Sequence, residues 1–302
     1  MERWQQKARL ALDGIKMEYD FPMTQLTTFK IGGPVDLLAM PENVDELGRV
    51  ISFCREEKLP WMTIGLGSNL IIRDKGIRGV VIKLAGDFLS WRIDGTQVTA
   101  GAGGGLADLA KDTAGHGLTG LEFACGIPGS IGGAVFMNAG AYEGEISQVL
   151  SDVRAYDLEQ GIVRYKAAEL EFGYRKSLFQ QKQQVILELV FNLQQGEAES
   201  VLSKIATLTC QRESKQPLEM PSAGSVFRRP EGYFVGPLIE AAGLKGYSMG
   251  GAQVSTKHAG FIVNTGGATA QNVLDLINHV QKVIKEKNGV DLIPEIKVMG
   301  EE

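Results

Sequence analysis

The spacing of apolar residues along the chain predicts a mixture of helices and strands. In some segments apolar residues recur every three or four positions, which is the period of an amphipathic helix. These expected helices are residues 42–54, 106–116, 198–213, 237–242 and 270–287. Short apolar or alternating runs predict strands instead, at residues 36–40, 61–64, 70–72, 80–84, 185–193, 260–263 and 296–298.

Two β-hairpins are also expected, because strand-like runs flank turn-forming residues. The pairs are 91–93 with 97–100 about Asp94-Gly95, and 153–158 with 162–166 near Gln160-Gly161. Residues 119–144, in contrast, are almost all turn formers and small residues. With helices and strands mixed along the chain, we expect an α+β fold.

The elements group into three consecutive parts. We expect a small α/β unit over residues 1–85, a second unit over 86–212 and a separate α+β unit over 213–302. Lys215-Gln216-Pro217 closely follows the third expected helix, at residues 198–213, and has the composition of a hinge.

Composition and charge exclude several classes of function. The net charge of −5 comes without a basic block, which argues against a nucleic-acid partner. The sequence contains no run of about 18 apolar residues, so no membrane span is expected. The N-terminus has no signal-peptide pattern. The three cysteines and three histidines lack the spacing of disulfide frameworks or zinc sites. We therefore expect a cytoplasmic protein without a metal, and its oligomeric state stays open.

Glycine is the unusual residue, with 38 copies that gather in clusters. The first candidate loop, residues 65–69 (GLGSN), follows a predicted strand. A dinucleotide-binding fingerprint would continue to a third glycine and a helix, whereas Leu70 here begins a strand-like run. A phosphate-binding P-loop is excluded, because the chain has no Gly-Lys followed by Ser or Thr.

The second candidate loop is residues 125–134 (CGIPGSIGGA). Glycines let several backbone N–H groups point into one hollow and let a ligand approach closely, which suits a pyrophosphate. Two such loops, with Ser68, Asn69 and Ser130 as further donors, favour a long dinucleotide. The alternative is that both loops are tight turns in a β-rich fold.

At these loops the chain resembles the UDP-N-acetylenolpyruvoylglucosamine reductase (MurB) family. The similar motifs follow in the same order over nearly the whole chain. They are residues 27–33 (TTFKIGG), 65–70 (GLGSNL), 126–134 (GIPGSIGGA), 138–142 (NAGAY), 174–177 (YRKS), 221–227 (PSAGSVF) and 294–296 (PEI). No insertion is apparent between Ser225 and the last helix, so the chain is similar to the shorter form of the family, which lacks a tyrosine-bearing loop.

The resemblance implies an FAD-binding fold of the vanillyl-alcohol-oxidase/PCMH type. Residues 1–85 and 86–212 would be its two FAD-binding subdomains, and 213–302 a C-terminal substrate-binding domain. FAD is expected to be non-covalent, since Ser68 and Asn69 stand where some flavoproteins of this fold carry a flavin-linked histidine. The implied cofactor-binding residues are Gly65, Leu66, Gly67, Ser68, Asn69, Leu70, Gly126, Ile127, Pro128, Gly129, Ser130, Gly132, Gly133 and Ala134.

The implied reaction reduces UDP-N-acetylglucosamine enolpyruvate to UDP-N-acetylmuramate, a step of peptidoglycan precursor synthesis. NADPH would reduce the flavin, and flavin N5 would pass hydride to the substrate. Arg175 matches the residue that stabilises charge on the substrate carboxylate, since a guanidinium binds a carboxylate through two hydrogen bonds. Ser225 matches the proton donor, and Glu295 would help to stabilise the enol-like intermediate.

The substrate is expected to meet further residues of the same motifs. Lys215, Arg228 and Arg229 are candidates for its diphosphate, which requires cations. Tyr174 and Asn138 would line the same cleft. His258 and Cys125, in contrast, are expected to be structural.

Two other functions stay open from the residues. One is an FAD-dependent oxidase of a sugar or hydroxy acid on the same fold. The other is a catalytically silent flavin- or nucleotide-binding module. The presence together of Arg175, Ser225 and Glu295 argues against both, and NADPH as reductant would distinguish them.

Overall fold

The computed structural model describes residues 3–302, and these form two compact units, each assembled from three separate segments. Unit 1 contains the chain up to Glu18 together with residues 37–66 and 80–212. Unit 2 contains residues 19–36, 67–79 and 213–302. The two compact units interleave along the chain. The predicted division into three consecutive domains, at residues 85 and 212, therefore stays a prediction.

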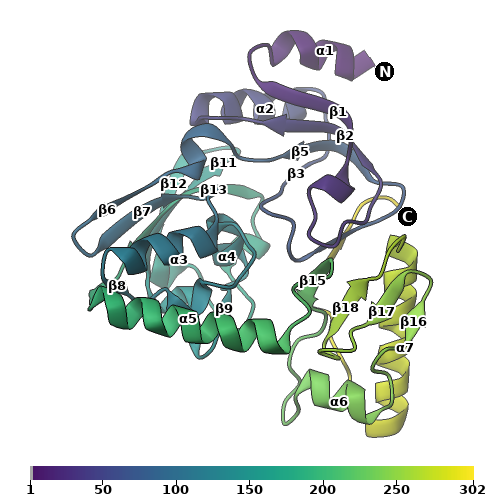
Figure 1. The fold of residues 1–302 in the computed structure, drawn as a ribbon. Helices are drawn as coiled ribbons and strands as arrows, with labels where there is room; N and C mark the ends of the chain where they lie inside the picture. Colours follow the sequence, from purple (N-terminus) through teal and green to yellow (C-terminus); the bar gives the residue numbers. More distant parts are fainter. Residues whose placement is uncertain (1–2) are drawn as a thin grey trace. The chain divides into compact units, whose positions relative to one another are not determined.

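The first third of the chain forms a four-stranded sheet and two helices (Figure 1). The strand order is β1-β2-β5-β3. The elements are α1 (Arg3–Ala11), β1 (Lys16–Pro22), β2 (Pro34–Met40), α2 (Val44–Glu56), β3 (Trp61–Thr63) and β5 (Ile77–Ile82). Helix α2 begins after Asn43, whose side-chain oxygen accepts the N–H of Glu46 at 2.9 Å. The predicted helix and strands over 36–64 are confirmed, whereas the strand predicted at 80–84 begins earlier, at Ile77.

The larger part of unit 1 is built on a five-stranded antiparallel sheet of order β12-β11-β13-β7-β6. Its strands are β6 (Trp91–Asp94), β7 (Gln97–Gly101), β11 (Leu150–Asp157), β12 (Gly161–Lys166) and β13 (Gln184–Asn192). Both predicted hairpins are confirmed, as β6 with β7 and β11 with β12. Helices α3 (Leu106–Gly115) and α4 (Ile131–Phe136) pack against this sheet and share its apolar core (Figure 1).

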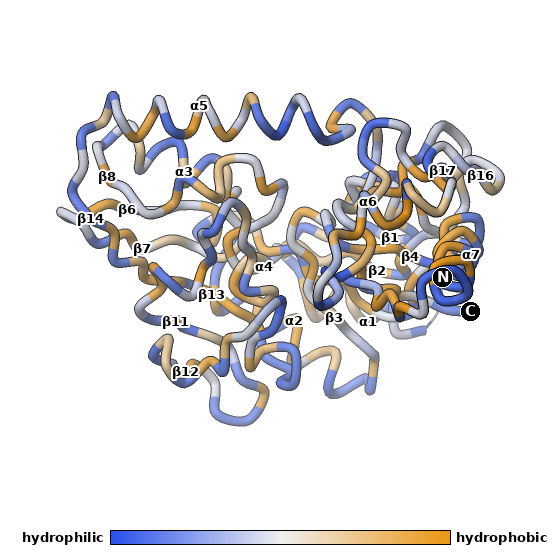
Figure 2. The backbone as a smooth tube through the Cα atoms, turned by 90° about the horizontal axis from the view of Figure 1, so that it is seen from below, coloured by the Kyte–Doolittle hydropathy of each residue, from blue (hydrophilic) through white to orange (hydrophobic). Residues whose placement is uncertain are grey.

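Helix α5 (Ala198–Lys215) contributes to the same core through Val201 and Ile205. Its other faces are polar, and Figure 2 shows the change as alternating orange and blue stretches along the helix. Two small sheets complete this region. They pair β8 (Leu118–Thr119) with β14 (Gln194–Gln195), and β9 (Gly140–Ala141) with β10 (Gly144–Glu145).

Helix α4 corrects the sequence analysis, which found only turn formers and small residues at 119–144. Ser130 caps the helix, its Oγ accepting the N–H of Gly133 at 3.1 Å. Gly132 and Gly133 have low helix propensity, so the helical pattern is weak in the sequence. Packing explains one of them, because a Cβ at Gly132 would lie 2.8 Å from the Cβ of Ala102.

Unit 2 contains a four-stranded sheet of order β15-β18-β17-β16 and a separate parallel pair of β4 with β19. Its elements are β4 (Leu70–Ile72), β15 (Ser222–Ser225), α6 (Val235–Ala241), β16 (Ser248–Met249), β17 (Ala252–Val254), β18 (Phe261–Asn264), α7 (Ala270–Asn288) and β19 (Lys297–Met299). Helix α7 buries one face in a second apolar core, which includes Val273, Leu276 and Val280.

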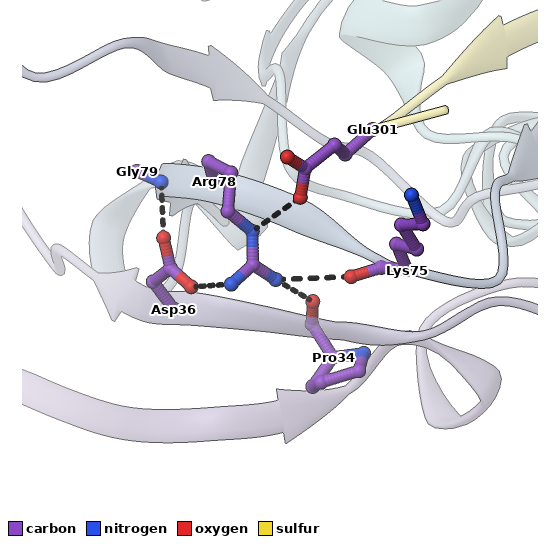
Figure 3. Close-up of polar contacts among 6 residues, drawn as sticks. All are labelled: Pro34, Asp36, Lys75, Arg78, Gly79 and Glu301. Carbon is purple, nitrogen blue, oxygen red and sulfur yellow. Dashed lines mark hydrogen bonds and ion pairs between the residues drawn. The ribbon is translucent and has the colours of Figure 1, made fainter.

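Arg78 joins three segments of unit 2 (Figure 3). Its guanidinium forms an ion pair with Asp36 at 2.5 Å and donates to the carbonyl oxygens of Pro34 and Lys75 at 3.3 and 3.1 Å. Glu301 lies 3.6 Å from its Nε. Exposed ion pairs alone contribute little. The two carbonyl contacts additionally attach Arg78, in β5, to the first residue of β2 and to the turn that precedes β5.

Candidate active site

The two glycine-rich loops meet within unit 1. A Cβ at Gly65 would lie 2.1 Å from the Oγ of Ser130, so the first loop packs directly on the serine of the second. Ser130 is buried at this contact and caps α4 at the same time. Glycine is therefore required at position 65 by close packing.

Most donors at the start of α4 are engaged by the protein itself. The N–H groups of Ile131 and Gly132 donate to the carbonyl oxygens of Gly104 and Ala102 at 2.9 and 2.8 Å. Gly133 donates to Ser130. The first two N–H groups hold the loop against residues 102–104, and the third closes the cap of α4. None of the three is therefore free to point into the hollow that the glycines predicted.

Arg212 lies beside the second loop and was missed by the sequence analysis. A Cβ at Gly126 would lie 2.6 Å from Cδ of Arg212, so this glycine makes room for the arginine. Burial lowers the pKa of Arg212, and its Nε is buried without a hydrogen-bond partner among residues 3–302. A buried unpaired donor calls for an acceptor, and the polar edge of a flavin or its pyrophosphate would supply one. The buried Nε of Arg212 beside Gly126 is therefore a donor that fits FAD.

The second half of the first loop belongs to unit 2. Gly67 has a φ of +64°, and a Cβ there would lie 2.1 Å from the carbonyl oxygen of Leu26. The side-chain amide of Asn69 donates to the carbonyl oxygen of Glu295 at 3.4 Å. The Asn69 carbonyl in turn accepts the N–H of Lys297 at 3.0 Å. The loop is thus held beside Glu295, one of the three predicted catalytic residues.

Arg175 lies in a tight turn of unit 1 with an unusual backbone. Its φ is +55°, in the left-handed region that favours glycine. The guanidinium donates to the carbonyl oxygen of Gly140 at 3.0 Å and lies 5.1 Å from the ring centre of Tyr174. Tyr174 is 54% exposed. Left-handed non-glycine residues are often found at functional sites, which agrees with the predicted role of Arg175.

Asn138 does not present a surface to a ligand. It is fully buried, and its amide donates to the carbonyl oxygen of Gly173 at 3.1 Å. Its side-chain oxygen accepts the N–H of Ser147 at 3.0 Å. The substrate contact predicted for Asn138 is therefore replaced, in this structure, by bonds that support the turn of Arg175.

Ser225 and Glu295 are brought together within unit 2. The N–H of Glu295 donates to the carbonyl oxygen of Val226 at 2.8 Å, and Phe227 pairs with Pro294. Ser225 is exposed, with its Oγ 3.4 Å from the carbonyl oxygen of Phe227, and Glu295 is half-buried. Two predicted catalytic residues, distant in sequence, thus lie on neighbouring backbone segments.

The predicted diphosphate residues of unit 2 differ in their surroundings. Lys215 is exposed at the end of α5, whereas Nε of Arg228 is buried and, within the described chain, has no hydrogen-bond partner. The guanidinium of Arg229 lies 3.9 Å from the ring centre of Phe234. The unpaired Nε of Arg228 is a donor that an anionic ligand would satisfy.

His258 and Cys125 occupy structural settings. His258 Nδ1 accepts the N–H of Gly260 at 3.1 Å, and burial lowers the pKa of its imidazole. Cys125 is buried, with Sγ 3.7 Å from Oγ1 of Thr209. The described part of the chain contains no cluster of potential metal ligands and no helix long and apolar enough to cross a membrane.

Two known protein families match separate parts of the chain. Residues 35–164 match the family described as "FAD binding domain". Residues 216–299 match "UDP-N-acetylenolpyruvoylglucosamine reductase, C-terminal domain". The expected α+β fold, an FAD-binding domain followed by this C-terminal domain, is confirmed by these matches and by a solved structure described next.

Two relatives that match this chain over nearly their whole length bear the same name. The chain is 49% identical over 286 residues to a UDP-N-acetylenolpyruvoylglucosamine reductase of Caldanaerobacter subterraneus, covering 95% of this chain and 94% of the relative. A relative of the same name from Clostridium perfringens is 50% identical over 281 residues, with coverage of 93% and 92%. The crystal structure of the Thermus caldophilus enzyme (MurB) superposes with a TM-score of 0.82 at 35% identity, covering 94% of this chain and 98% of that one.

Sequence identity of this order, over almost the full length of both chains, is much stronger evidence of family membership than any single glycine motif. The resemblance inferred from seven motifs thus extends to the residues between them. The chain belongs to the UDP-N-acetylenolpyruvoylglucosamine reductase (MurB) family.

Proposed function

We propose that the chain uses NADPH and FAD to reduce UDP-N-acetylglucosamine enolpyruvate to UDP-N-acetylmuramate, in peptidoglycan precursor synthesis. The observation that carries this proposal is identity of 49–50%, over at least 93% of the chain, to relatives that bear the name of this reductase. The chain also has Arg175, Ser225 and Glu295 at the matching motif positions.

FAD supplies hydride-transfer chemistry when it is bound, and the protein supplies position and polarity. Gly65 and Gly132 allow the close approach of chain segments that shapes its loops. Arg212 offers a buried donor beside Gly126. Ser68 and Asn69 complete the predicted set on the first loop.

Arg175 would bind the carboxylate of the enolpyruvyl group. Negative charge grows on that carboxylate as the neighbouring double bond accepts hydride, and a fixed cation lowers the barrier. The contact of the guanidinium with the Gly140 carbonyl and the Tyr174 ring orients it before substrate arrives. Preorganisation of this kind is worth more than the same charge on a mobile side chain.

Ser225 would give a proton to the α-carbon of the reduced substrate. Its hydroxyl is exposed and bound only weakly to the Phe227 carbonyl, so little must be broken for it to turn toward a ligand. Glu295 lies on the adjacent segment. It would stabilise the enol-like intermediate until the proton from Ser225 reaches the α-carbon. Lys215 and Arg228 would bind the diphosphate, and the reaction would take place in the cytoplasm.

The half-reactions of the purified protein test the proposal. NADPH is expected to bleach the flavin absorption, and the enolpyruvyl nucleotide to restore it without oxygen. In Ser225→Ala, bleaching is expected to proceed normally while the return slows by about 10²–10⁴-fold, the usual contribution of a general acid. Ser222→Ala, on the same strand β15, is the matched control and should resemble the unmodified protein.

Two results would contradict these assignments. Equal slowing of both half-reactions in Ser225→Ala would remove the proton-donor role. The proposed reaction itself would be overturned if the enolpyruvyl nucleotide failed to reoxidise the unmodified protein. Flavin reduction by a sugar or hydroxy acid, followed by rapid reoxidation by oxygen, would then favour the oxidase alternative.

A further inference from the structure

Arg175 is held in a backbone conformation that its own residue type disfavours. At a φ of +55° the Cβ of a non-glycine residue is crowded by the neighbouring carbonyl. Such a conformation persists only where the surrounding structure imposes it. The bonds that impose it here come from two amide side chains.

Asn138 provides the first bond, donating from its amide to the Gly173 carbonyl at 3.1 Å, two residues before Arg175. Gln180 provides the second, donating to the carbonyl of Arg175 itself at 3.0 Å and to Phe136 at 2.9 Å. Between these points, Gly173 and Lys176 exchange backbone hydrogen bonds at 3.1 and 3.2 Å. The turn is therefore fixed on both sides of the arginine.

Asn138 also fixes the acceptor of the guanidinium. Nη2 of Arg175 donates to Gly140, which follows Asn138 by two residues. Asn138 has a φ of +41°, and its side-chain oxygen is bound by the N–H of Ser147 at 3.0 Å. One buried amide thus joins the segment that carries the arginine to the segment that receives its guanidinium.

Both segments depend on α4. The residue that caps the helix, Ser130, contacts the first glycine loop at Gly65. The helix ends at Phe136, whose carbonyl accepts from Ser177 and Gln180 at 2.7 and 2.9 Å. The six residues of α4 separate the glycine-loop contact from the turn of Arg175. A displacement at either end would be transmitted through a short, buried helix.

We propose that Asn138 is a positioning residue that sets the guanidinium of Arg175 for the second half-reaction. It does not touch substrate, since it is fully buried. This inference rests on the proposed function, in which Arg175 binds the carboxylate of the enolpyruvyl group as that group accepts hydride.

Asn138→Gly tests the proposal, because glycine accepts the left-handed backbone and lacks both amide bonds. The rate of flavin bleaching by NADPH is expected to stay within about twofold of the unmodified protein. Reoxidation by the enolpyruvyl nucleotide is expected to slow by about 10- to 100-fold, the scale of a misplaced reacting group. In an Arg175→Ala background, Asn138→Gly is expected to slow reoxidation no further, since the residue it positions is gone.

Thr113→Val is the matched control, a fully buried polar residue of unit 1 with one side-chain bond to backbone, to Ala110 at 3.1 Å. It is expected to lower the free energy of unfolding without slowing reoxidation by the enolpyruvyl nucleotide more than flavin bleaching by NADPH. If Asn138→Gly fails to fold, Gln180→Met removes the bonds on the other side of the turn, and the same selective loss is expected.

Loss of both half-reactions to the same degree, or additive effects of Asn138→Gly and Arg175→Ala, would overturn the positioning role. Both results presuppose that the unmodified protein is reoxidised by the enolpyruvyl nucleotide. Absence of that reoxidation would count against the proposed function, so the two failures are distinguishable.

Discussion

Position 65 has no room for a side chain, because the Ser130 hydroxyl lies 2.1 Å from where a Cβ would stand. We predict that Gly65→Ala separates the two glycine loops and weakens FAD binding. The purified variant should carry less flavin per chain than the unmodified protein, measured as the ratio of flavin to protein absorption after gel filtration.

The control for this change is Gly115→Ala, at the last residue of α3, where a Cβ meets nothing within 4 Å. Full flavin content is expected there, with stability unchanged or raised by up to about 0.5–1 kcal/mol because alanine favours the helix. Full flavin content in Gly65→Ala as well would show that the loop contact is not needed for the cofactor.

His258 predicts how stability responds to pH. Burial lowers the pKa of its imidazole from 6.5, while Nδ1 accepts the N–H of Gly260. Between the folded pKa and 6.5 the unfolded chain therefore binds more protons than the folded chain. The contribution of His258 is fully present above about pH 6.5 and is lost as the pH falls through the folded value.

Urea unfolding at several values between about pH 5 and pH 8 measures this contribution. His258→Asn, which retains an acceptor near the Nδ1 position, is expected to make the free energy of unfolding less dependent on pH below 6.5. His116→Asn is the control, because His116 is exposed. An unchanged pH dependence in His258→Asn would show that other groups produce it.

At the scale of elements, the long helices were the most predictable part of the molecule. Helix α7 was expected at residues 270–287 and spans Ala270–Asn288, because its apolar residues keep the helical period from Ala270 to Ile284. Helix α4 was missed, since two of its six residues are glycines, of which close packing requires Gly132. Propensity describes a local preference, which close tertiary packing overrides.

The cap of α7 gives a prediction at this scale. Thr269 Oγ1 accepts the N–H of Asn272 at 3.1 Å, and the Asn272 side chain accepts the N–H of Thr269. Thr269→Ala is expected to lower the free energy of unfolding by about 1 kcal/mol, the usual cost of a lost N-cap. Denaturant titration followed by far-ultraviolet circular dichroism measures the change.

Thr207→Ala is the matched control, because Thr207 lies exposed inside α5 and bonds only to the Ser203 carbonyl one turn earlier. Alanine has the higher propensity there, so stability should stay the same or rise. A loss of equal size in both variants would mean that the capping bond of Thr269 contributes nothing.

The candidate site was predictable only in part, because the roles of its residues depend on their surroundings in the fold as well as on their residue type. Arg175, Ser225 and Glu295 were selected by motif resemblance, since arginine, serine and glutamate are ordinary surface residues elsewhere. Arg212 was missed because its distinguishing property is burial beside Gly126, which no local pattern encodes. Asn138 was assigned to a ligand because its satisfied amide becomes visible only once Gly173 and Ser147 are placed around it.

At the scale of the whole molecule, each compact unit combines segments that the sequence keeps far apart. Hydrophobic period identifies β4 and β19 as strands, but it does not tell which strand pairs with which. Their parallel pairing aligns Leu70 with Lys297 and Ile72 with Met299. The three contiguous parts expected from the sequence therefore describe the order of elements, whereas the two units describe their packing.

This pairing has a consequence for the growing chain on the ribosome. Position 297 follows position 70 by 227 residues, which takes roughly 10 to 45 s at about 5–20 residues per second. During that interval β4 lacks its only partner strand in the described chain, although Ile71 and Ile72 are fully buried in the finished protein. An unpaired apolar strand edge favours association with other chains. The nascent protein thus has a long period in which chaperones have an apolar segment to cover.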